Sequence, residues 1–196
     1  MKRIVALFAL SVLVATLSGC VTPHAYVDPQ YQKASFDSIQ RPAQPVPVKV
    51  EVHFQRNGAA YDKVDKTLQA DVEQSLKKIG VFAPSAATAA GTITVTADNI
   101  ADLDDARSKG FKVGLSFGAA GQTVDDNYEF VCVYKAGGAD KSFSYHHVIH
   151  STIGNAAAPI AGVAPLKPAD AFQKVVEDIM VNFVKDLQDA GLAPKQ

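Results

Sequence analysis

Apolar and polar residues alternate along several stretches of the chain, which is the pattern of a strand with one buried face. The first stretch, residues 46–55, reads VPVKVEVHFQ, and Asn57-Gly58 behind it is typical of a tight turn. The same period of two returns at residues 91–97, 111–117, 127–135 and 142–150. The pattern therefore predicts one strand before residue 60 and three or four after residue 90.

Two other stretches place their apolar residues at helical spacing. The first covers residues 61–78 and is followed by Gly80, a favoured residue just past a helix end. The second begins at Pro168, a favoured first-turn residue, and is followed by Gly191. Their apolar stripes are Val64, Leu68, Val72, Leu76 and Ile79 in the first, and Phe172, Val175, Val176, Ile179, Met180, Phe183 and Leu187 in the second.

The resulting order of elements is β-α-β-β-β-α, and it defines the expected fold class. Short turns between the later strands imply antiparallel pairing. Each strand has one apolar face, so the two amphipathic helices must cover one face of a single sheet. We therefore expect an α+β domain over residues 46–196, with one mainly antiparallel sheet.

The N-terminus has the features of a bacterial lipoprotein signal. Two basic residues precede an uncharged run, residues 4–17, which is too short to span a bilayer but suits a signal-peptide core. Leu17-Ser18-Gly19-Cys20 follows and resembles a lipobox, in which cleavage after the glycine frees a cysteine for acylation. This predicts a signal peptide over residues 1–19, cleavage between Gly19 and Cys20, and lipid attachment at Cys20.

Residues 20–45 are expected to be a lipidated cysteine followed by an extended tether. Residues 21–45 show no stable period and contain four prolines. An alternative is that the aromatic residues Tyr26, Tyr31 and Phe36 dock part of this segment on the domain.

The composition excludes some classes of binding partner but indicates no chemical reaction. A net charge of −1, without a basic cluster, argues against nucleic acid. Cys132 has no partner once Cys20 is acylated, and its place in an alternating aromatic stretch predicts that its thiol is buried.

Three histidines within SFSYHHVIH raise the question of a metal or catalytic site. On a strand, His147 faces the core whereas His146 and His150 face outward, about 13 Å apart at ~3.3 Å per residue. His53 on the first strand also faces outward. One metal needs much closer ligands, so we expect no metal, cofactor or catalytic residue, and His53, His146 and His150 are weak candidates only.

The stretches HFQRNG, ARSKGF, GLSFGAAGQTVDDNYEF, HVIHSTIGN and AFQKVVEDIMVNF resemble an uncharacterised family of proteobacterial outer-membrane lipoproteins. The residue after Cys20 is Val21 and not aspartate, which by resemblance to enterobacterial lipoproteins implies sorting to the outer membrane and not retention at the inner one. The resemblance implies a lipid-anchored protein with its domain in the periplasm.

Its expected role is a non-catalytic binding or adapter module for an envelope protein or a peptidoglycan-associated partner. In layout the chain is also similar to tethered lipoproteins that activate peptidoglycan synthases. The alternative is a metal-dependent or hydrolytic envelope enzyme built on His53, His146 and His150.

Overall fold

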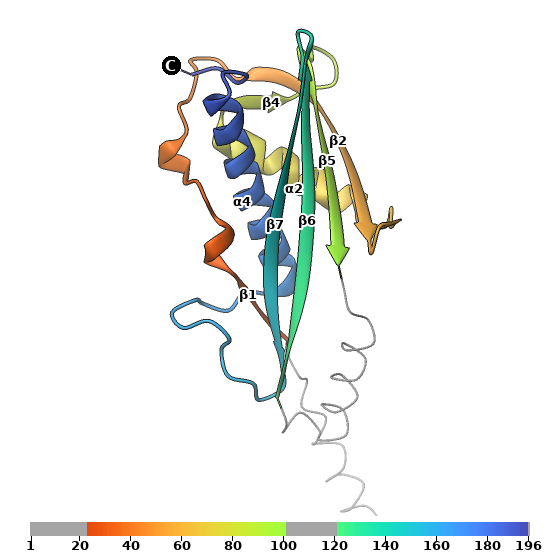
Figure 1. The fold of residues 1–196 in the computed structure, drawn as a ribbon, viewed down its shortest axis with the longest axis vertical. Coiled ribbons are helices and arrows are strands. Elements are labelled where there is room, and N and C mark those ends of the chain that lie inside the picture. The colour runs from red at the N-terminus through yellow and green to blue at the C-terminus, as the bar shows by residue number, and fades with distance from the viewer. Residues whose placement is uncertain (1–22, 101–120, 196) are drawn as a thin grey trace, which may run out of the picture.

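A computed structural model describes residues 23–100 and 121–195 and shows one seven-stranded mixed sheet with two helices on one face (Figure 1). The strands run in the spatial order β1-β7-β6-β5-β2-β3, and β4 pairs with β2. Their bounds are β1 His24–Val27, β2 Val46–Arg56, β3 Ala59–Ala60, β4 Phe82–Pro84, β5 Gly91–Ile100, β6 Gln122–Ala136 and β7 Ala139–Ile153. The helices are α2 Asp65–Ile79 and α4 Pro168–Asp189, with short 3-10 turns η1 Pro29–Tyr31 and η2 Phe36–Ser38.

The predicted β-α-β-β-β-α order and mainly antiparallel sheet are wrong in two respects, and the first is the pairing of β2. This strand pairs with β5 in parallel from Val48↔Gly91 to Arg56↔Asn99. Helix α2 carries the chain back along the sheet between them, so β5 starts at the same end as β2, which makes the pair parallel. The pairs β5–β6 and β6–β7 are antiparallel, as expected for the later strands.

The second error is the extended tether, because the chain belongs to the fold from residue 24 onward. Strand β1 pairs with β7, from His24↔Thr152 to Val27↔Ile149. Residues 28–41 then run beside α4 (Figure 1). The docking alternative described this segment better than the tether did, since Tyr26 is buried and Tyr31 packs against two histidine rings.

Buried amide side chains on α4 hold this irregular segment in place. Oδ1 of Asn182 accepts hydrogen bonds from the backbone N–H groups of Lys33 and Ala34, at 3.0 and 2.9 Å, and its Nδ2 donates to the carbonyl of Tyr31. Gln188 bonds both the N–H and the carbonyl of Gln40. Backbone N–H and C=O groups that are removed from water need hydrogen-bond partners. These two amides therefore provide hydrogen bonds that a neighbouring strand would otherwise have provided.

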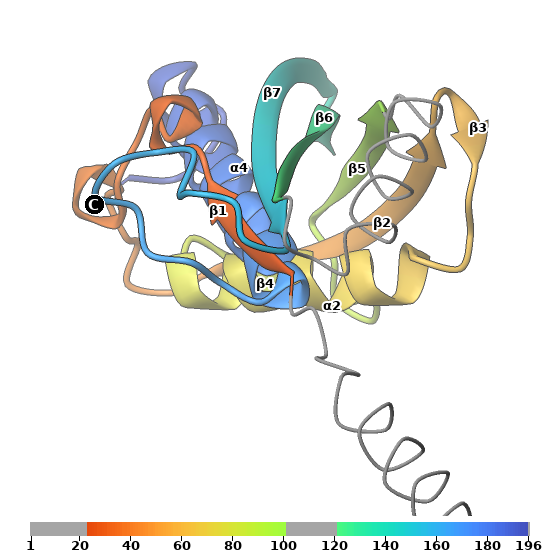
Figure 2. The same cartoon turned by 90° about the horizontal axis from the view of Figure 1, so that it is seen from below.

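The core lies between the sheet and the two helices, which contact each other and cross at an angle (Figure 2). Aromatic side chains join the layers, with Phe54 against Phe172 and Phe143 against Phe183. Cys132 is fully buried on this face, as predicted, and burial raises the pKa of its thiol. A thiol in this state is inert.

The glycines that the sequence offers as turn and helix-end signals lie at such ends in the structure. Asn57 and Gly58 both have positive φ, at 51° and 75°, and form the turn between β2 and β3. Gly80 ends α2 in the left-handed region, and Nε of Arg41 donates to the last helical carbonyl, Ile79 O, at 2.8 Å.

The strand expected at residues 111–117 lies outside the described residues. Within residues 23–100 and 121–195, neither helix has the length and apolarity to cross a bilayer.

The change Asn182→Leu is expected to lower the free energy of unfolding by about 1–3 kcal/mol, because it removes the partner of three partly buried backbone groups of residues 31–34 and leaves its own buried position without their hydrogen bonds. Urea denaturation measures this loss. Gln173→Leu, a half-buried position of the same helix, should change stability by less than about 0.5 kcal/mol. Equal stability of the two variants would show that the segment is held by other contacts.

Candidate functional site

The three histidines of β7 point to both faces of the sheet, as the strand register predicts. His147 is fully buried beneath α4, whereas His146 and His150 lie on the opposite face at the edge next to η1 and β1. The structure therefore gives them different surroundings, although they lie within five positions of one another.

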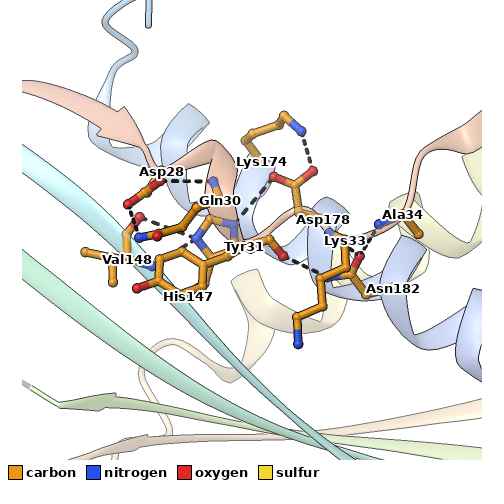
Figure 3. A network of polar contacts seen from close by, with 10 residues as sticks. All are labelled: Asp28, Gln30, Tyr31, Lys33, Ala34, His147, Val148, Lys174, Asp178 and Asn182. Carbon is orange, nitrogen blue, oxygen red and sulfur yellow. Dashed lines mark hydrogen bonds and ion pairs between the residues drawn. The ribbon is translucent and has the colours of Figure 1, made fainter. Parts of the chain in front are cut away.

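His147 belongs to a buried polar network with α4 (Figure 3). Its Nδ1 accepts a hydrogen bond from the Val148 N–H at 2.9 Å, so Nε2 carries the proton of the neutral ring. Nε2 points at Oδ2 of Asp178 from 3.6 Å, beyond hydrogen-bond length. The other carboxylate oxygen of Asp178 binds Lys174, which compensates its buried charge. The ring is thus packed and oriented, and neither of the two hollows described below is lined by His147 or Asp178.

His146 and His150 lie at hydrogen-bond distance from carboxylates on the neighbouring strand. His146 lies 2.8 Å from Glu129 and His150 lies 2.7 Å from Asp125, each across the β6–β7 ladder. His150 also approaches Asp28 at 3.5 Å. Burial would raise the pKa of Asp28, but hydrogen bonds from Gln30 and His150 outweigh it and lower that pKa. These rings thus already have partners within the fold.

The weak metal candidates do not converge. His53 is exposed on β2, which is separated from β7 by β5 and β6, so it lies roughly 14 Å away at ~4.8 Å per strand. In the part of the chain that the structure describes, no group of three or more His, Cys, Asp or Glu residues could hold a metal ion. His53, His146 and His150 therefore do not form one site.

Sequence reasoning missed a polar cavity where β2, β5 and β6 meet the N-terminal turns of both helices. It has a volume of about 290 Å³ and is lined by Phe54, Arg56, Val64, Asn99, Asp126, Tyr128 and Phe172. The amide Nδ2 of Asn99 is buried beside the carboxylate of Asp126, without a hydrogen bond of standard length and angle to any described residue. Such an orphan donor costs stability, so its presence at a cavity favours a role in binding.

The electrostatics of this cavity are perturbed by burial. Desolvation raises the pKa of Asp126, although the nearby Asn99 amide and the Arg56 guanidinium offset part of the rise. Burial, together with the charge of Asp126, also raises the pKa of Tyr128, so its hydroxyl stays protonated. Arg56 lies over the ring of Tyr61, 5.1 Å from its centroid. The cavity thus combines donors, one carboxyl group and two phenylalanine walls.

A larger hollow of about 500 Å³ lies between residues 32–38 and α4. The lining side chains of α4 have partners within the fold, since Asn182 holds the N-terminal backbone, Lys185 pairs with Asp189, and Asp186 accepts from the hydroxyl of Tyr145 at 2.7 Å. With these groups satisfied, the hollow offers a ligand less than the cavity at Asn99 does.

A signal for the smaller cavity is present in the sequence. On β5 the buried positions read Ile93, Val95, Ala97 and then Asn99, so a polar residue occupies a core position at the end of the strand. Asp126 has the same parity on β6 as Phe130 and Cys132. Polar residues at core-facing positions are the exception that needs an explanation.

Cys20 and Gly19, the predicted lipid attachment and cleavage residues, lie outside the described residues. Four aspartates lie within residues 98–105, and of these the structure describes only Asp98, whose carboxylate oxygens accept from the Gly58 N–H. It therefore closes the turn between β2 and β3.

No family model and no curated protein match the chain. Among solved structures, it is similar to a PelC variant dodecamer from Paraburkholderia phytofirmans, with 11% identity over 76% of this chain and 93% of that chain and a TM-score of 0.34. It is also similar to an uncharacterised protein, with 14% identity over 78% and 95% of the two chains and a TM-score of 0.28. At such TM-scores neither structure bears on the function of this chain.

The change His147→Ala is expected to lower the free energy of unfolding by about 1–3 kcal/mol, because it empties a packed position and leaves Val148 N–H and Asp178 without the ring. The double change His146→Ala, His150→Ala should cost less than about 1 kcal/mol, since it removes only partly exposed ion pairs. Urea denaturation compares them. A zinc-dependent rise in melting temperature that the double variant loses would contradict the separation of these histidines.

Proposed function

We propose that the protein is a lipid-anchored bacterial cell-envelope protein whose domain is a non-catalytic binding module. Its place is the outer membrane, with the domain in the periplasm, as the residue after Cys20 and the resemblance given above suggest. Its binding site is the cavity around Asn99, Asp126 and Arg56. Its partners belong to the envelope, either a protein or a peptidoglycan-associated molecule.

The observation that supports the anchor is where the fold begins. Strand β1 starts at His24, four residues after Cys20. Cleavage between Gly19 and Cys20 therefore removes nothing that the described fold uses. Acyl chains on Cys20 contribute about 0.8 kcal/mol per buried CH₂ and are sufficient to hold the domain at a bilayer.

The observation that carries the binding role is the buried Nδ2 of Asn99, which lies beside the Asp126 carboxylate but makes no hydrogen bond of standard geometry among the described residues. It calls for a ligand with a hydrogen-bond acceptor, such as a carbonyl or carboxylate oxygen. The phenylalanine rings of Phe54 and Phe172 provide an apolar wall beside it. A small ligand with a polar head and a short apolar part fits these surroundings. No observation favours the alternative of an enzyme built on His53, His146 and His150.

The change Cys20→Ala is expected to abolish acylation and release the protein from the membrane while leaving its melting temperature unchanged, because residue 20 precedes the described fold. Radiolabelled palmitate should enter the wild-type protein and not the variant. Cys132→Ala is the matched control and should be labelled like the wild type, since that thiol is buried. Equal labelling of the wild type and Cys20→Ala would refute the anchor.

The change Asn99→Leu is expected to leave the refolded, ligand-free protein as stable as the wild type or up to about 1 kcal/mol more stable, because it removes an unsatisfied buried donor. The same variant should lose small molecules that co-purify with the wild type, detected by mass spectrometry after denaturation. Asn182→Leu is the control, since its amide is paired and its loss destabilises. A loss of stability in Asn99→Leu equal to that control, or an unchanged set of co-purifying molecules, would refute the binding role.

A further inference from the structure

We propose that the loop of residues 154–167, between β7 and α4, rests on the lipid bilayer that holds Cys20. This inference depends on the proposed lipidation and adds to it a defined orientation of the domain. The bilayer is the occupant of this surface, and a protein partner is the outcome that would overturn the proposal.

The length of the chain between anchor and fold fixes the end of the domain that lies at the membrane. Only three residues, Val21 to Pro23, separate Cys20 from β1. Four Cα steps reach at most about 14 Å. Strand β7 has 15 residues, so the sheet extends roughly 50 Å along it at ~3.3 Å per residue. The turn at Gly137-Gly138, at the far end of β7, is therefore out of reach of the anchor.

The loop lies at the same end as the first residues of β1. Ala25 and Leu166 exchange both backbone hydrogen bonds, at 2.9 and 2.8 Å. At the other end of the loop, the backbone at Asn155 and Ala156 lies so close to Gly121 that a Cβ there would clash. Figure 1 shows the loop beside β1, at the end of the molecule opposite the β6–β7 turn.

The chemistry of the loop suits a bilayer surface. Residues 156–166 read AAAPIAGVAPL and contain no charged or hydrogen-bonding side chain. Much of this run is exposed, namely Ala157, Ala158, Pro159, Ala161, Gly162, Ala164 and Pro165. Lys167 follows the run, where its ammonium group could reach lipid phosphates while the apolar side chains meet the acyl boundary.

The uncovered sheet face is less suited to this role. It carries charged residues along its middle strands, among them Lys49, Glu51, Glu129 and Lys135. Removing such charges from water is costly. The anchor reaches the apolar loop first, so the loop is the surface that the bilayer covers.

The chain contains no tryptophan, so a single introduced indole reports on one position. Ala161→Trp places it on the loop and Asp140→Trp places it at the far end of β7, both at exposed positions. Ala158→Trp replaces the first variant if that variant fails to fold. Each full-length lipidated protein is reconstituted into phosphatidylethanolamine–phosphatidylglycerol vesicles that contain brominated lipids. We expect the Ala161→Trp emission to shift to the blue and to be quenched, and the Asp140→Trp emission to stay unchanged.

Palmitate labelling of the same preparations separates the two proposals. Acylated protein without quenching at residue 161 overturns the loop contact and leaves the anchor intact. Absence of acylation overturns both. Burial of the residue 161 indole in native envelope membranes, without quenching in pure lipid vesicles, assigns the loop to a protein partner and also overturns the proposal.

Discussion

The hydrogen bonds from Asn182 and Gln188 to residues 31–40 are the interaction on which the rest of the arrangement depends. An irregular segment can lie against a helix only if its backbone groups find partners there. These two amides supply them, so the chain between β1 and β2 follows α4 and does not extend into solvent. Because the segment is fixed, β1 can pair with the edge of β7, and the fold reaches back to within four residues of Cys20.

The sequence pattern predicted the elements better than their connections. The alternation in residues 46–55 and the apolar stripe of α2 depend on local periodicity, and both elements are present. Strand β1 has four residues and its partner lies more than a hundred positions away, so no local period reveals it. The apolar residues of α4 do indicate that a further segment covers this helix. A helix that buries Val181 and Val184 as well as Val175 and Ile179 must be covered on more than one side. The parallel pairing of β2 with β5 follows from the crossover through α2. The sequence pattern did predict a helix between these two strands, so the parallel pairing could have been predicted.

The same distinction applies to the candidate site. Strand geometry predicted that His146 and His150 face one side of the sheet and His147 the other, because this alternation needs only a period of two. The carboxylates that face these rings come from β6, from α4 and from Asp28 just before η1, so their positions depend on tertiary structure. Asn99 and Asp126 could have been found as polar residues with core parity at strand ends. Their convergence with Phe172 could not, since that contact depends on how α4 lies across the sheet.

The proposed orientation also decides which surfaces remain for a partner. With the β1 end at the bilayer, the β6–β7 turn lies roughly 50 Å away along β7 at ~3.3 Å per residue. The open face, with its rows of threonine, serine and paired charges, then stands in water. The cavity at Asn99 lies near the last residues of β2 and β5, toward the same end of the sheet as β1. A ligand at the cavity and a partner on the open face would therefore bind different parts of one rigid sheet, and neither would have to displace the N-terminal segment that α4 holds.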